Sequence, residues 1–243
     1  MKLIFVHGSG NTGKFWHYQT AYFPDSEAIT LPGHPEGEPC KSVGDYADWV
    51  RGYIHEKGYQ EVILAGHSLG GAIVMDYALR YPEDLKALIL IGTGARLRVH
   101  PMYLSWCEEG IKDKAGWLKN WEPTYDLVAP ELRKELLEEL MRVGPAVQLN
   151  DLLCCDKFDI MDKVHQIKLP TLVLCGSEDQ MTPVKYTRYL ADKIEGAKQV
   201  IIEGGTHHVA IEKPDEVNRA IEEFMKSLPY SDSSRSPLQG NQR

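Results

Sequence analysis

A serine, an acidic pair and a histidine pair stand at three separate places in this sequence, each shortly after a run of aliphatic residues. Ser68 comes first, Glu178 and Asp179 are adjacent, and His207 and His208 follow. A serine hydroxyl is a weak nucleophile until a base removes its proton and a third group orients that base. These residue types could therefore carry out nucleophilic acyl chemistry, provided that the fold brings one of each kind together.

The residues around Ser68 predict a sharp turn between a buried strand and a helix. The aliphatic run 62–65 ends at Gly66, and after Gly70 a helix-forming segment covers 72–81. Small residues two positions before and two after the serine allow the strand and the helix to pass closely, while the serine backbone is strained. We expect this turn to hold the hydroxyl above the end of the sheet, beside the positive end of the helix.

Six short aliphatic runs, each bounded by turn residues, predict six strands. They are nearly continuous rather than alternating, as is typical of parallel strands that are covered on both faces. The runs are 2–7, 28–31, 62–66, 87–92, 171–176 and 198–202.

Helical patterns separate these runs. Ser42 followed by Asp45 is a variant of the capping box and predicts the start of one helix. The predicted helices are 43–57, 72–81, 184–194 and 216–228. Alternating strands and helices predict an α/β fold with a doubly wound parallel sheet. Ligands of such sheets bind at the carboxyl ends of the strands, where Ser68 is expected to lie.

The segment 96–168 interrupts this alternation, because it contains helical patterns and no convincing strand. We interpret it as a helical cap inserted into a core made of 1–95 and 169–230. Placed above the strand ends, the cap would cover the pocket at Ser68. The tail 231–243 is rich in Ser, Pro and Gln, and we expect it to be disordered. The cap helices are predicted at 102–111, 115–120, 130–143, 146–155 and 160–167.

Composition indicates an ordinary globular protein of one large domain. Of the 243 residues, 43% are hydrophobic and 26% are charged, and the net charge is −8. No long basic run is present, so nucleic acid and anionic membranes are poor candidate partners. No apolar stretch approaches the roughly 20 residues that span a bilayer. The apolar start of the chain is too short for a signal peptide, and we expect a cytoplasmic protein whose partner is a small molecule.

The five cysteines give no evidence of a cofactor or metal. Their positions form no metal-ligand spacing, and an odd number cannot all pair within one chain. We therefore expect reduced thiols in a cytosolic protein, with neither a metal nor a cofactor. The oligomeric state stays open between monomer and homodimer. The cysteines are Cys40, Cys107, Cys154, Cys155 and Cys175.

The motifs together resemble the α/β-hydrolase superfamily, in the group of small carboxylesterases, meta-cleavage-product hydrolases and cofactor-free haloperoxidases. The chain carries G-x-S-x-G at Ser68, then G-x-x-D-x-x-x-P at Asp179, then a G-x-x-H loop followed by E-x-P. The order serine, acid, histidine is that of this superfamily. The resemblance runs from the His7-Gly8 turn to Pro214. It implies an α/β-hydrolase fold, but the strand that leads into His7-Gly8 starts at Lys2, so we expect the two extra N-terminal strands of many members to be missing and predict six strands, all parallel.

The resemblance also implies a role for each residue. Ser68 would attack a carbonyl carbon, His207 would accept its proton, and Asp179 would orient the imidazole. The backbone N–H groups of Ser9 and Leu69 would bind the developing oxyanion.

Two of these choices rest on the spacing in the family's motifs. His207 is preferred over His208 because the family's histidine lies five residues before the E-x-P glutamate, here Glu212. Asp179 is preferred over Glu178 because the acid lies four residues before Pro183.

A nucleophilic serine excludes the dehalogenase and epoxide hydrolase routes, which the family performs with aspartate. Because acyl transfer needs only the groups named above, we predict a serine carboxylesterase for small or medium acyl esters, acting through an acyl-enzyme. One alternative is a carbon–carbon hydrolase, although such enzymes usually carry an aromatic residue after the histidine, where this chain has His208-Val209. Another is a noncatalytic ligand receptor on the same fold.

Overall fold

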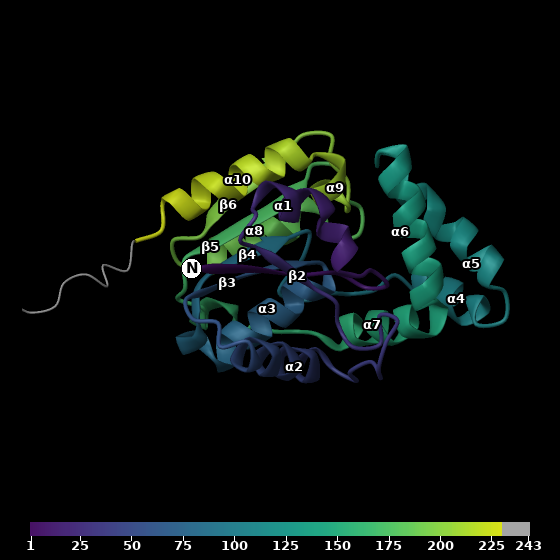
Figure 1. The fold of residues 1–243 in the computed structure, drawn as a ribbon, viewed down its shortest axis with the longest axis horizontal. Helices are drawn as coiled ribbons and strands as arrows, with labels where there is room; N and C mark the ends of the chain where they lie inside the picture. Colours follow the sequence, from purple (N-terminus) through teal and green to yellow (C-terminus); the bar gives the residue numbers. More distant parts are fainter. Residues whose placement is uncertain (230–243) are drawn as a thin grey trace, which may run out of the picture.

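The computed structural model describes residues 1–229 and contains one central sheet of six parallel strands. The spatial order is β2-β1-β3-β4-β5-β6, and every neighbouring pair is parallel, so the predicted wholly parallel sheet is confirmed. Figure 1 shows helices above and below this sheet. The strands are β1 (Lys2–Val6), β2 (Glu27–Ile29), β3 (Val62–His67), β4 (Leu85–Ile91), β5 (Thr171–Gly176) and β6 (Lys198–Ile202).

Two layers of apolar side chains hold the sheet between the helices. Along β1, Ile4 and Val6 pack toward one layer, whereas Leu3 and Phe5 pack toward the other, as the alternation of side chains along a strand requires. The inner strands are buried on both faces, which explains their continuous aliphatic sequences.

Five helices and one short turn of helix cover these two faces. α2 and α3 pack together on the first face, and α10 lies on the opposite face (Figure 1). The predicted cap of α2 is present, because the Ser42 hydroxyl accepts a hydrogen bond of 3.0 Å from the Asp45 N–H. The helices are α1 (His17–Tyr22), α2 (Val43–Glu56), α3 (Leu69–Arg80), α8 (Val184–Lys193), α9 (Val209–Glu212) and α10 (Pro214–Lys226).

Helix α3 begins at Leu69, three residues before the sequence-based start at Ala72. The glycines that suggested a loop are instead the first turn of the helix. Ser68 alone forms the turn, and its carbonyl already accepts hydrogen bonds from the N–H groups of Gly71 and Ala72.

The inserted segment contains four helices, and α4, α5 and α6 lie beyond the carboxyl end of β1 in Figure 1. The two ends of the insertion meet in a short antiparallel bridge between Arg96 and Asp159. Because Ile160 donates to the Ala95 carbonyl, the expected helix 160–167 is reduced to the short 3-10 helix Val164–Gln166. The insertion helices are α4 (Pro101–Gly110), α5 (Lys114–Trp121), α6 (Pro130–Val143) and α7 (Pro145–Lys157).

Two sequence-based expectations concern membranes and the tail. Within residues 1–229, no helix combines the length and the apolar character that a bilayer crossing requires. The predicted disordered tail, 231–243, lies outside the described residues.

Candidate active site

The turn after β3 holds Ser68 in a backbone conformation that side chains rarely adopt. Its φ is 54° and its ψ is −115°, and such a residue costs about 1–3 kcal/mol unless its surroundings enforce it. The neighbouring glycines provide that enforcement. A Cβ atom at Gly66 would collide with the Gly70 carbonyl, and one at Gly70 would collide with the Val6 carbonyl of β1. The strand and helix therefore cross at a distance that only glycine allows.

The structure brings His207 against Asp179, from loops that follow β6 and β5. His207 Nδ1 lies 2.9 Å from Asp179 Oδ2, and both side chains are buried. Burial alone would raise the pKa of the Asp179 carboxyl. The adjacent His207 and the hydrogen bonds from Thr182 outweigh burial and lower this pKa from 3.8 to about 2. Asp179 is therefore ionised at neutral pH and can orient the imidazole.

Thr182 is a residue of this site that the sequence interpretation missed. Its hydroxyl donates to Asp179 Oδ2 at 2.8 Å and lies 3.3 Å from His207 Nδ1. The Asp179 Oδ1 atom accepts the backbone N–H groups of Met181 and Thr182 at 2.9 and 2.8 Å. An aspartate followed by a threonine three residues later is a turn signal, and it could have indicated this contact.

Ser68 and His207 line one cavity of about 350 Å³, which insertion residues also line. Its lining combines residues that follow the strand ends with residues of the insertion. The lining residues are Ser68, Leu97, Arg98, Val99, His100, Tyr103, Trp121, Leu152, Cys155, Gln180, Met181, Thr182, Pro183, Lys185, Tyr186 and His207.

The two alternative residues of the sequence analysis lie elsewhere. His208 donates from Nδ1 to the Thr124 carbonyl at 2.9 Å and stacks on Tyr125, with 4.3 Å between the ring centroids. Burial and the neighbouring His207 lower the pKa of His208 to about 4. Glu178 is exposed and does not line the cavity. The geometry thus places His207 and Asp179, rather than His208 and Glu178, next to each other.

The loop after β1 lies directly against the serine turn. A Cβ atom at Gly8 would lie 3.1 Å from the Ser68 Cβ atom, so the absence of a side chain there permits the contact. His7 is buried beneath this loop, where its Nδ1–H donates to the Gly8 carbonyl at 2.8 Å. Burial holds the pKa of His7 well below its usual range. Ser9 directly follows Gly8, so its backbone amide lies in the loop that contacts the Ser68 turn. The Leu69 amide is also close to this turn, because Leu69 is the residue directly after Ser68.

His67, the neighbour of Ser68, is buried and does not line the cavity. Its Nε2–H donates to the His207 carbonyl at 2.8 Å, and its ring stacks on Phe15 with centroids 4.5 Å apart. This hydrogen bond connects the backbone of the histidine loop to β3.

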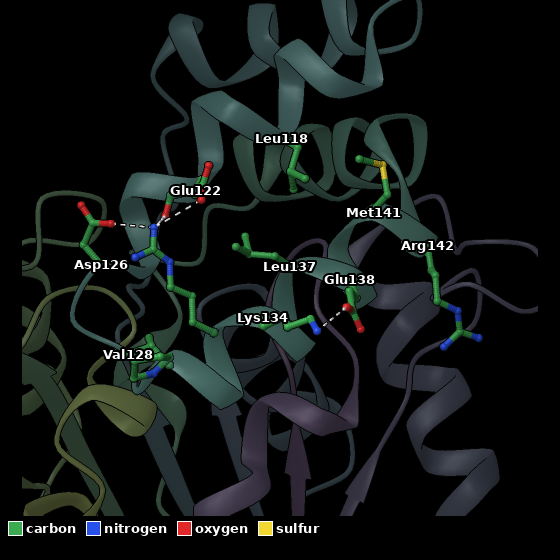
Figure 2. A pocket seen from close by; sticks show the side chains of 11 residues that line it. Leu118, Glu122, Asp126, Val128, Lys134, Leu137, Glu138, Met141 and Arg142 are labelled. Carbon is green, nitrogen blue, oxygen red and sulfur yellow. Dashed lines mark hydrogen bonds and ion pairs between the residues drawn. The ribbon is translucent and has the colours of Figure 1, made fainter.

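A larger hollow of about 680 Å³ lies on the insertion, between α5 and α6, and Ser68 does not line it (Figure 2). Its charged side chains neutralise one another. Arg133 pairs with Asp126 at 2.8 Å, and Lys134 pairs with Glu138 at 4.0 Å. The smaller cavity, rather than this surface hollow, contains the groups that could perform chemistry.

Among residues 1–229, no group of three or more His, Cys, Asp or Glu side chains could hold a metal ion. All five cysteines are free, and Cys155 is one of the residues that line the cavity. Burial raises the pKa of the Cys155 thiol well above its usual range, so this thiol is not a nucleophile at neutral pH.

Comparisons with known proteins place these observations in a wider context. A model described as "Alpha/beta hydrolase family" matches residues 3–220. The (E)-2-((N-methylformamido)methylene)succinate hydrolase of Acinetobacter baylyi is 25% identical over 93% of this chain and 91% of its own length. The 2-hydroxy-6-oxo-6-phenylhexa-2,4-dienoate hydrolase of Comamonas testosteroni is 28% identical over 73% of this chain and 67% of its own. A solved structure of a thermophilic esterase is 34% identical, with a TM-score of 0.79, covering 92% of this chain and 89% of the esterase.

Proposed function

Because this chain belongs to the alpha/beta hydrolase family, we propose that it is a serine carboxylesterase that hydrolyses small or medium acyl esters. One observation carries the proposal. Ser68, on a strained turn, and His207, held by an ionised Asp179, line the same cavity. The cavity is at the small end of the usual range of ligand pockets, about 300–1,000 Å³, which favours small or medium acyl groups.

The proposed reaction begins when Ser68 Oγ attacks the ester carbonyl carbon and passes its proton to His207 Nε2. The oxyanion of the tetrahedral intermediate receives hydrogen bonds from the Ser9 and Leu69 N–H groups. The carbon–oxygen bond to the leaving group then breaks, and His207 donates its proton to the departing alcohol. This leaves an acyl-enzyme on Ser68.

Water completes the cycle. His207 removes a proton from a water molecule, whose oxygen attacks the acyl carbon, and the collapse of the second intermediate returns the proton to Ser68 Oγ. Asp179 keeps the Nδ1–H of His207 directed toward itself and stabilises the imidazolium in both halves of the reaction. Thr182 holds the carboxylate in place.

The comparisons support hydrolysis and leave two kinds of scissile bond to compare. The solved structure that is 34% identical to this chain is described as an esterase, whereas the Comamonas testosteroni relative is named as a hydrolase of a phenylhexadienoate. That name is the specific observation behind the second candidate, a carbon–carbon hydrolase. In this chain the ring after His207 is His208, which points to Thr124 instead of into the cavity, and the ester assignment remains our first proposal.

The test is a burst assay with p-nitrophenyl acetate, butyrate and hexanoate. Wild type should release nitrophenol in a burst followed by steady turnover, and Ser68→Ala should show neither. Mass spectrometry of the quenched protein should find the acyl group on Ser68. Equal inactivity of both proteins, or undiminished activity of Ser68→Ala, would contradict the proposal. A rate on the phenylhexadienoate, followed by absorbance, that far exceeds every ester rate would favour the carbon–carbon alternative.

A further inference from the structure

The cavity at Ser68 has an uneven distribution of charge. Its walls are formed largely by apolar and aromatic residues from the insertion, among them Leu97, Tyr103 and Trp121. The charged residues of its lining are Arg98 and Lys185, and among the described residues that line it there is neither Asp nor Glu. Both basic residues are exposed, so they lie where the cavity opens to solvent.

Neither cation has a counter-ion in the part of the chain that the structure describes. Within residues 1–229, the side chains of Arg98 and Lys185 form no ion pair and no hydrogen bond; Lys185 Nζ lies 5.9 Å from the centre of the Tyr186 ring. Their neighbour Arg96 differs, because it pairs with Asp159 at 3.6 Å. The Asp156 carboxylate accepts a hydrogen bond of 3.1 Å from the Val99 N–H instead of pairing with either cation.

The two cations come from different parts of the fold. Arg98 lies between β4 and α4, at the start of the insertion, and Lys185 lies in the first turn of α8. The first turn of α8 contains no acidic residue, and Pro183 and Tyr186 of the same region also line the cavity. Two unpaired cations, one from the core and one from the insertion, therefore line the same cavity.

This charge contrasts with the rest of the molecule. Acidic residues outnumber basic ones, 35 to 27, and the net charge of −8 repels small anions from the surface as a whole. An anionic ester would have to overcome that repulsion to reach Ser68. A local pair of cations at the opening would offset it and would raise the association rate of anions in particular.

We propose that Arg98 and Lys185 select esters that carry a carboxylate remote from the scissile bond, so that the substrate is a monoester of a small dicarboxylic acid. The proposal rests on the esterase function above and names its substrate class. The ester group would lie at Ser68, the methylene chain along the apolar walls, and the free carboxylate between the two cations.

The test compares monomethyl adipate with methyl hexanoate, which have the same chain length but differ in the terminal carboxylate. Wild type should prefer monomethyl adipate in kcat/KM, measured by the methanol released. Because an exposed ion pair contributes only modestly, Arg98→Gln and Lys185→Gln should each lower this value about threefold, and the double variant about tenfold. The rate on methyl hexanoate should change less than about twofold.

Salt and matched substitutions control for general effects. High salt should reduce the rate of wild type on monomethyl adipate and leave the double variant almost unaffected, because salt screens exposed charges. Lys112→Gln and Arg219→Gln remove exposed cations that do not line the cavity, and both should behave as wild type. An equal loss on both esters, or no loss in the double variant, would overturn the proposal.

A binding measurement separates this inference from the proposed function. Calorimetry with Ser68→Ala and monomethyl adipate detects the carboxylate site without any turnover. Binding that weakens about tenfold when both cations are replaced would support the charge selection even if no ester is hydrolysed. If methyl hexanoate binds as tightly as monomethyl adipate, the selection by charge is refuted, whether or not the protein is an esterase.

Discussion

His34 Nε2 lies 2.8 Å from Asp151 Oδ2, and neither side chain is exposed to solvent. Asp151 belongs to α7 of the insertion, and it also accepts the Gly10 N–H at 3.0 Å and the Tyr46 hydroxyl at 3.0 Å. Gly10 directly follows Ser9. One carboxylate thus fastens the insertion to the loop that, in our proposal, supplies an oxyanion donor.

Replacing this carboxylate should impair both stability and turnover. In Asp151→Asn, the amide oxygen can still accept from His34 and Gly10 while the amide nitrogen faces the Tyr46 hydroxyl, but the negative charge opposite His34 is lost and the neutral oxygen is a weaker acceptor for the Gly10 N–H. Breaking a buried ion pair costs about 3–5 kcal/mol, and urea denaturation should show a loss of that order. Displacement of the Ser9 amide should lower kcat on an ester about tenfold or more, with little effect on KM. The exposed Asp162→Asn is the control. An unchanged kcat in stable Asp151→Asn would contradict the role of this contact.

The same pair predicts a loss of stability at high pH. His34 Nδ1 lies 3.1 Å from the Pro32 carbonyl, so both ring nitrogens face acceptors and must carry protons. Burial opposes this charge, but Asp151 outweighs it and raises the pKa of His34 above 6.5. The stabilisation by a raised pKa is complete below the unfolded value and is lost as pH rises through the folded value. The stability difference between wild type and His34→Gln in urea denaturation should therefore shrink as pH rises; a constant difference would refute the ionised pair.

Thr182 should act through Asp179 rather than on the substrate. Thr182→Val keeps the shape of the side chain and removes the hydrogen bond to Asp179 Oδ2. A hydrogen bond to a charged group is worth about 1.5–3 kcal/mol, and kcat should fall about tenfold as the imidazole loses its fixed orientation. The lowered pKa of Asp179 stabilises the fold above pH 3.8, and this stabilisation is lost as pH falls toward about 2.

The pH profile distinguishes this role from a general packing effect. In Thr182→Val the pKa of Asp179 should be higher, so acid unfolding should begin at a higher pH than in wild type. Thr20→Val removes a hydroxyl that donates only to backbone carbonyls near α1. This variant should leave kcat and the pH at which acid unfolding begins unchanged. If acid unfolding began at the same pH in wild type and Thr182→Val, the hydroxyl would not stabilise the ionised carboxylate.

The elements of the fold were predictable because their signals are local. The strands β5 and β6 have the bounds that their aliphatic runs predict, and Val217 and Phe224 are buried on α10 as the helical spacing indicates. The prediction for α3 was less accurate at its start, where two glycines in a helix resemble a loop. The structure explains both glycines, because a Cβ atom at Gly70 would collide with the Val6 carbonyl and one at Gly71 would collide with the Thr93 side chain.

The contacts of the site that sequence could not predict join distant segments. His34 and Asp151 are 117 positions apart, and nothing in the pattern of either segment indicates a partner. Arg98 and Lys185 likewise become neighbours of one cavity only through the packing of the insertion. Thr182 is only three residues from Asp179, but its hydroxyl reaches the carboxylate only because the loop between them forms a turn. Motifs therefore indicate which residues are candidates, whereas packing determines what supports them.

His208 should make the fold sensitive to acid. It is buried between Tyr125 and the neighbouring rings of His67, His207 and Phe15, and its Nδ1–H is bound to Thr124 of the insertion. Its pKa is lowered to about 4, so the folded state keeps the ring neutral while the unfolded chain takes up a proton. A depressed histidine pKa stabilises the fold above pH 6.5, and the stabilisation is lost as pH falls from 6.5 to about 4. The shift is equivalent to roughly 3 kcal/mol.

Urea denaturation of wild type and His208→Gln between neutral pH and about pH 4 tests this assignment. Wild type should lose more stability than the variant over that interval, since the glutamine does not titrate. Buried His7 and His67 also have pKa values below their usual range, so the variant should keep part of the acid sensitivity. Ester turnover at neutral pH should change much less in His208→Gln than in His207→Gln, because His208 contacts the insertion whereas His207 lines the cavity with Ser68. An equal loss of turnover in the two variants would contradict the assignment of His207 as the base.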